Sequence, residues 1–123
     1  MEGMELIAFE IITNVGMAKS LAMEAIKTAR EGDFDEAEAK LKESSEYLLN
    51  GHHAHASLIQ QEASGDKVEF SLIIMHAEDQ MMSAETIKVL AEEMIEMYKE
   101  IRKSNKNLNL NENEFEKIAY ENV

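Results

Sequence analysis

The chain contains no cysteine, proline or tryptophan, and it has only five glycines in 123 residues. Without cysteine it cannot form disulfides, thiolate metal sites or thiol intermediates, and it fits a reducing compartment. Without proline it lacks the strongest helix breaker, and the scarcity of glycine leaves few turns. Because Ala, Glu, Lys, Met and Leu are abundant instead, the composition predicts an all-α fold.

Positive charge is also scarce, since 12 Lys and Arg stand against 25 Asp and Glu and give a formal net charge of -13. Such a chain repels phosphate backbones, so nucleic-acid binding is not expected. No uninterrupted apolar run approaches the roughly 20 residues that span a bilayer, and Glu2 and Glu5 do not fit the basic start of a signal peptide. These features predict a cytoplasmic single domain without membrane insertion, whose length suits an oligomer.

Apolar residues recur at spacings of three and four in three long segments, which predicts three helices. The expected ranges are 5–30, 33–64 and 69–103. Gly32 and Asp33 supply a stop and a cap between the first two helices, and Gly65 begins the turn to the third. Long helices with short links predict an antiparallel three-helix bundle.

Two stretches are expected to depart from this regular pattern. Asn50-Gly51 interrupts the second helix, so a bend or a weak point is predicted there. After residue 103 the chain becomes rich in asparagine, and residues 104–123 are expected to form a loose extension in which 114–120 make one or two helical turns. The predicted domain therefore covers residues 1–103.

A histidine and an aspartate stand inside the apolar pattern of the predicted third helix. His76 and Asp79 follow the spacing of apolar residues there, so we expect them to share a stripe with the core. An ionised carboxylate on such a stripe costs several kcal/mol unless it is paired or metal-bound. Reflection about the turn at Gly65 places His55 near the level of His76, and His52 near the level of Asp79.

These polar residues allow three interpretations. The simplest is a set of solvated histidines with one satisfied core histidine. The second is a zinc site made from His52, His55, His76 and Asp79, whose ligand types are suitable. The third is phosphoryl carriage on His76, in which a neutral imidazole nitrogen attacks a phosphoryl group and later releases it. Hydrogen bonds to that group could come from His52, His55, Gln80 and Ser83.

A series of motifs follows one order and spacing along about residues 4–103. The motifs are Phe9-Glu10-Ile11-Ile12, Gly16-Met17-Ala18-Lys19-Ser20, Gly32-Asp33-Phe34, His52-His53, Leu58-Ile59-Gln60-Gln61-Glu62-Ala63-Ser64-Gly65 and Met75-His76-Ala77-Glu78-Asp79-Gln80-Met81-Met82. Each is weak alone, but the ordered set is specific. It resembles the lactose/cellobiose-type IIA proteins of the bacterial phosphoenolpyruvate-dependent sugar phosphotransferase system.

The resemblance implies a three-helix subunit that assembles as a homotrimer and acts as a phosphocarrier of the transferase class. His76 would accept a phosphoryl group from phospho-HPr and pass it to a cysteine of the cognate IIB protein during sugar uptake. The protein would have no small-molecule turnover of its own.

The resemblance also implies that Asp79 from each subunit lies near the threefold axis, where it can bind a divalent cation. Three carboxylates gathered in an apolar seam repel one another, and a hard cation with oxygen ligands relieves that repulsion. A structural magnesium ion is therefore expected at the trimer axis.

Two positions depart from the family pattern. Members commonly have glutamine where this chain has His55, and histidine where it has Gln80. We expect this exchange to preserve a hydrogen-bonding site beside phosphorylated His76. The stretch 58–60 is nearer to cellobiose or chitobiose members than to lactose members, which favours a β-disaccharide of that kind. The alternative from another class is a regulatory bundle that binds partners and is never phosphorylated.

Overall fold

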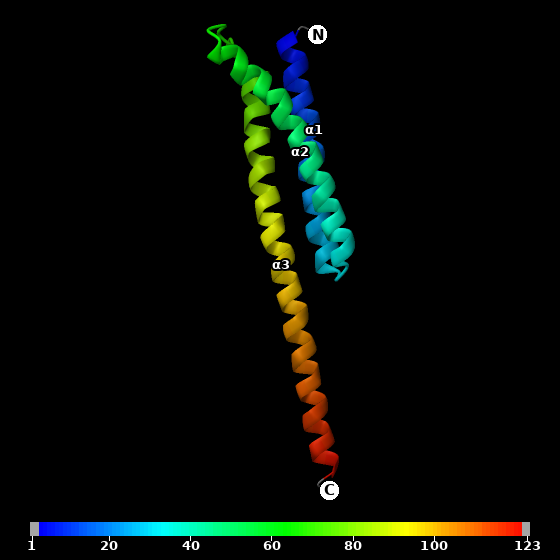
Figure 1. The fold of residues 1–123 in the computed structure, drawn as a ribbon. Coiled ribbons are helices and arrows are strands. Elements are labelled where there is room, and N and C mark those ends of the chain that lie inside the picture. The colour runs from blue at the N-terminus through cyan, green and yellow to red at the C-terminus, as the bar shows by residue number, and fades with distance from the viewer. Residues whose placement is uncertain (1–2, 122–123) are drawn as a thin grey trace.

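The computed structural model of the chain describes residues 3–121 and contains three long helices in this range. The helices are α1 (Gly3–Arg30), α2 (Phe34–Ala63) and α3 (Leu72–Glu121). Figure 1 shows α1 and α2 as an antiparallel hairpin, with α3 running beside both and continuing well beyond their closed end. The predicted all-α, three-helix architecture is confirmed.

The turn between α1 and α2 has the predicted chemistry. Gly32 has a φ of 93°, in the left-handed region that glycine adopts most readily. The carboxylate of Asp33 then accepts a hydrogen bond from the backbone N–H of Glu36 at 3.2 Å, which caps α2. The guanidinium of Arg102 packs over Gly32 and donates to the carbonyl of Arg30 at 3.1 Å, so α3 also holds the end of α1.

The second turn is longer than predicted. Gly65 has a φ of 91°, as expected for the end of α2, but α3 begins at Leu72 and not near Glu69. The hydroxyl of Ser71 accepts a hydrogen bond from the backbone N–H of Ile74 at 3.2 Å. This serine cap fixes the start of α3 and leaves residues 64–71 as the connection.

The core lies mainly along α1, which packs extensively against both other helices, whereas α2 and α3 touch each other less. Its buried residues are Ala8, Ile11, Val15, Ala18, Leu21, Ala22, Ala25 and Ala29. The many alanines let the neighbouring helices approach closely. Where α2 crosses α1, the buried hydroxyl of Ser44 donates to the carbonyl of Ala18 at 2.6 Å.

The predicted weak point at Asn50-Gly51 is a close helix crossing, and α2 is continuous through it. A Cβ on Gly51 would stand 2.8 Å from a methyl carbon of Val15, so the glycine allows the two backbones to meet. Figure 1 shows α2 curving along its length without a break.

The prediction that the third helix ends near residue 103 is wrong. α3 continues to Glu121 because no glycine or proline follows Gly65 to interrupt it. The described side chains from Ile101 to Leu108 are all exposed. Placing a domain boundary at residue 103 stays a prediction.

By length and composition alone, α1 is apolar enough to cross a membrane, although Glu10 and Lys19 interrupt its apolar sequence. Its buried side chains belong to the two cores that it shares with α2 and α3. Core packing is therefore a sufficient reason for its apolar composition.

Candidate functional site

His76 lies near the start of α3, on the side of the helix that faces away from the core. The buried residues of α3 are Ala77, Met81, Ala84, Ala91 and Ile95. His76 precedes the first of them and is turned from it by roughly 100° around the helix axis. The prediction that His76 and Asp79 share a stripe with the core is therefore wrong within one chain, because the small residues of α3 take the inner face.

Asp79 stands on an outer face of α3 that is unusually apolar. Leu72, Met82 and Met97 on this face are 78%, 65% and 60% exposed. Asp79 is itself exposed, so in a single chain its charge is solvated and needs no partner. The apolar seam expected around Asp79 thus lies on the surface, where another chain can cover it.

The two α2 histidines contact glutamates of α3. His52 Nε2 lies 2.8 Å from Glu85 Oε1. His55 Nε2 contacts the carboxylate of Glu78, although not with the geometry of a hydrogen bond. These pairs add to the link between Lys99 and Glu38, whose 3.0 Å hydrogen bond is the main cause that raises the pKa of Lys99.

His55 therefore lies at about the predicted level of α3, but it contacts a different side of that helix from the one that carries His76. Glu78 follows His76 by two residues, which places the two side chains on nearly opposite sides of the helix. Within one chain neither His52 nor His55 is brought together with His76. Gln80 follows His76 by four residues, is half-buried, and shares its side of α3.

A zinc site from these residues is not formed within the part of the chain that the structure describes, where no three His, Cys, Asp or Glu side chains converge. The predicted ligands separate because His52 and His55 turn toward glutamates while Asp79 points outward. One carboxylate is too few to hold a magnesium ion, and Asp79 fits that role only as one of several copies.

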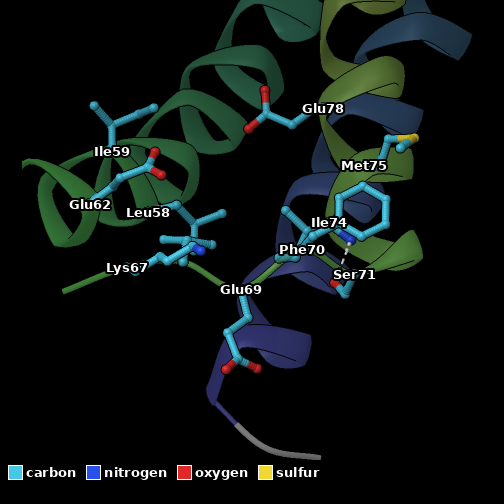
Figure 2. A pocket seen from close by; sticks show the side chains of 11 residues that line it. Leu58, Ile59, Glu62, Lys67, Glu69, Phe70, Ser71, Ile74, Met75 and Glu78 are labelled. Atoms are coloured by element: carbon cyan, nitrogen blue, oxygen red, sulfur yellow. Dashed lines mark hydrogen bonds between the residues drawn. The ribbon is translucent and has the colours of Figure 1, made fainter.

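A groove of about 680 Å³ opens beside the α2–α3 connection and was not predicted from the sequence. Figure 2 shows its walls, with Leu58 and Ile59 from α2 and Ile74 and Met75 from α3. Phe70, in the connection, is 77% exposed at its edge. The sequence signal that could have indicated this groove was Phe70, an aromatic residue between the turn at Gly65 and the cap of the next helix. Met75 joins this groove to the turn of α3 that carries His76.

These features define a three-helix protein with an exposed histidine, His76, near the start of α3 and an open, mainly apolar groove at the α2–α3 connection. Residues 6–99 match the family described as the lactose/cellobiose-specific IIA subunit of the PTS system. The chain belongs to this family.

Curated relatives agree with this membership. The lichenan-specific phosphotransferase enzyme IIA component of Bacillus subtilis is 47% identical over 100 residues, which cover 81% of this chain and 91% of the relative. The lactose-specific EIIA component of Staphylococcus epidermidis is 36% identical over 95 residues, covering 77% of this chain and 91% of the relative.

Solved structures show the same fold. The cellobiose-specific enzyme IIA from Bacillus anthracis superposes with a TM-score of 0.81 at 41% identity, covering 83% of this chain and 94% of that one. The IIA(chitobiose)–HPr complex of Escherichia coli gives 0.72 at 32% identity, covering 83% and 99%. In both, the superposition leaves 17% of this chain outside the matched length.

Proposed function

We propose that this protein is a cytoplasmic phosphocarrier that accepts a phosphoryl group on His76 from phospho-HPr and delivers it to a cysteine of the cognate IIB protein. The observation that carries the proposal is the exposure of His76 on α3, within a chain that belongs to the IIA family. A carrier must meet two proteins in turn, and an imidazole on an open helix face is accessible to both.

The chemistry needs a neutral imidazole nitrogen. Its lone pair forms a nitrogen–phosphorus bond with the incoming phosphoryl group while the bond to the donor protein breaks. In the second transfer a thiolate of IIB attacks phosphorus, the nitrogen–phosphorus bond breaks, and His76 returns to its starting form. The phosphoryl group thus passes through His76, and this chain is chemically unchanged after the two transfers.

Gln80, His52 and His55 are proposed as supporting residues. Gln80 lies one turn from His76 on the same side of α3, where its amide can donate to phosphoryl oxygens. His52 and His55 act through their contacts with Glu85 and Glu78, which fix α2 against the segment of α3 that carries His76.

HPr is the proposed donor because the E. coli relative named for chitobiose was solved as a complex with HPr. Met75, one residue before His76 and 49% exposed, offers apolar surface near the imidazole for a docking protein, and it also borders the groove at the α2–α3 connection. This groove is open and lies between helix ends. It is therefore better suited to contact with a protein surface than to enclosing a small substrate.

The proposed transported sugar is a β-linked disaccharide of the cellobiose or chitobiose kind. The relative named for lichenan is 47% identical, whereas the one named for lactose is 36% identical. The structure of a cellobiose-specific relative also superposes well. The specificity of uptake itself belongs to another subunit.

The working unit is proposed to be a homotrimer in which the outer faces of α3 meet. This arrangement covers exposed apolar residues such as Leu72, Met82 and Met97. It also gathers three copies of Asp79, which magnesium would bridge through oxygen ligands.

The test is the intact mass of the protein after incubation with phosphoenolpyruvate, enzyme I and HPr, under conditions that preserve acid-labile phosphoramidates. We expect a gain of one phosphoryl group in the wild type and none in His76→Gln. His53→Gln is the matched control, because His53 is also exposed, and it should gain the group. No gain in a folded wild-type protein would overturn the proposal and favour a partner-binding bundle.

A further inference from the structure

The C-terminal part of α3 leaves the three-helix body and continues as a single helix (Figure 1). Arg102 still contacts the end of α1, where its guanidinium donates to the carbonyl of Arg30. The helix runs on to Glu121, beyond the family match, which ends at residue 99. Isolated helices of this length are marginal in water, and asparagine is a poor helix former. A stable helix in this segment therefore needs packing contacts with another helix.

Exposed apolar residues that run from the three-helix body into this C-terminal part of α3 follow a heptad pattern. They are Leu90, Met94, Met97, Ile101 and Leu108, with exposed fractions between 38% and 60%. Their steps alternate between four and three, with Ser104 filling the position between the last two. This alternation is the a/d pattern of a coiled-coil seam, and it places the residues on one stripe.

The pattern continues in the sequence to the end of α3. The next a/d positions are Asn111, Phe115 and Ile118. Met94, Ile101, Leu108 and Phe115 thus occupy successive a positions. Polar residues at two d positions, Ser104 and Asn111, are the kind of core residue that sets register at some cost in stability. An a/d stripe that extends beyond the three-helix body indicates a coiled coil.

The charges favour parallel, in-register copies of the same segment. In that arrangement each g position faces the e position five residues later in the next chain. Glu100 then faces Asn105, Asn107 faces Glu112, and Glu114 faces Ala119. These three pairs bring no like charges together, although the chain carries a net charge of -13. The segment can therefore pair with itself despite its acidity.

We propose that residues 101–121 form a parallel three-stranded coiled coil with the same segment of two further copies of this chain. The stalk continues the α3 seam of the body, and its strand number rests on the homotrimer proposed above. It buries Ile101 and Leu108, which the single chain leaves exposed at two of the a positions.

The absence of cysteine gives a direct test on the full-length protein. Asn111→Cys introduces a thiol at a d position, where side chains of neighbouring parallel strands face one another, and mild oxidation should give a disulfide-linked pair of chains. Asn113→Cys introduces the same group at the outward f position and should stay monomeric on a non-reducing gel. Linkage of both variants to the same extent, or of neither, would overturn the stalk.

A second pair of variants measures the contribution of the seam. Leu108→Glu puts a carboxylate at an a position, whereas Leu110→Glu puts it at the outward c position two residues away. We expect Leu108→Glu to weaken self-association at least about ten-fold, because a buried unpaired charge costs more than the roughly 1.4 kcal/mol of one decade. Leu110→Glu should leave it unchanged, and equal effects would contradict the seam.

The phosphorylation assay separates the two proposals. If the stalk is absent, Asn111→Cys fails to cross-link while His76 still gains a phosphoryl group. If the carrier function is wrong, His76 gains none while the cross-link still forms.

Discussion

The two faces of α3 carry apolar residues of different size. The inner face is built mainly on alanines, with Ala77, Ala84 and Ala91 beside the larger Met81 and Ile95, while the outer face carries the exposed Leu72 and Met82. Small side chains permit close helix packing, but larger ones remove more apolar area from water when covered. Large apolar residues that stay exposed, such as Leu72 and Met82, are surface that the proposed trimer would cover.

The sharpest test of this comparison uses the neighbouring residues Met81 and Met82, which are 3% and 65% exposed. Met81→Glu buries an unpaired carboxylate and should lower the free energy of unfolding by about 3 kcal/mol or more. Met82→Glu should retain the helical fold but lose the trimer. Urea denaturation and sedimentation measure the two effects. An equal loss of stability in both variants would break the comparison.

The outer face should also confer a dependence on magnesium. In the wild-type trimer, magnesium at about 100 times its Kd adds roughly 2.7 kcal/mol of stability, which a chelator removes. Asp79→Asn removes both the repulsion and the ligands, so its stability should not respond to the chelator. Thermal unfolding with and without chelator measures this difference. An unchanged trimer mass and stability in both proteins would show that Asp79 holds no metal.

The close approach of helices on the inner side can be tested with two glycines. Gly51→Ala places a methyl group 2.8 Å from Val15 and should cost about 1–3 kcal/mol of stability. Gly16→Ala meets nothing within 4 Å and should instead gain about 0.5–1 kcal/mol through helix propensity. Chemical denaturation of both variants gives the comparison. Stabilisation by Gly51→Ala would show that the crossing is looser than described.

The smallest expected effect concerns the α2 histidines. His55 is half-buried against Glu78, whereas His53 is exposed. His55→Ala should slow phosphoryl transfer about three-fold, equivalent to roughly 0.7 kcal/mol, and His53→Ala should leave the rate unchanged. Rapid-quench transfer from phospho-HPr measures the rates. Negligible and equal effects would remove His55 from the supporting residues.

Local chemistry made the start and end of the helices partly predictable. The turn at Gly32 and Asp33 depends on residues adjacent in sequence, so its cap was identified correctly. The start of α3 was missed by a few residues because Ser71 was not recognised as its cap. The C-terminal extension was expected to be loose from its asparagines, but it contains no residue that stops a helix.

Periodicity could not decide which face of α3 is buried. His76 and Asp79 fall on a stripe where apolar residues recur at helical spacing, and that spacing predicted the stripe as the core. The alanine face competes with it and is chosen by its fit against α1, which is a property of the packed helices. The rotation of α2 that turns His52 and His55 toward glutamates depends on the same packing. It could not be predicted from the sequence either.

Because α3 is unbroken, it also fixes the distance between His76 and the end of the helix. Glu121 stands about 45 residues beyond His76, so at 1.5 Å per residue the two ends are roughly 70 Å apart. The N-terminal end of α1, in contrast, lies at the same end of the bundle as the start of α3 (Figure 1). A purification tag or surface anchor attached behind Glu121 therefore leaves the imidazole open to its donor, whereas one on the N-terminus stands close to the reaction.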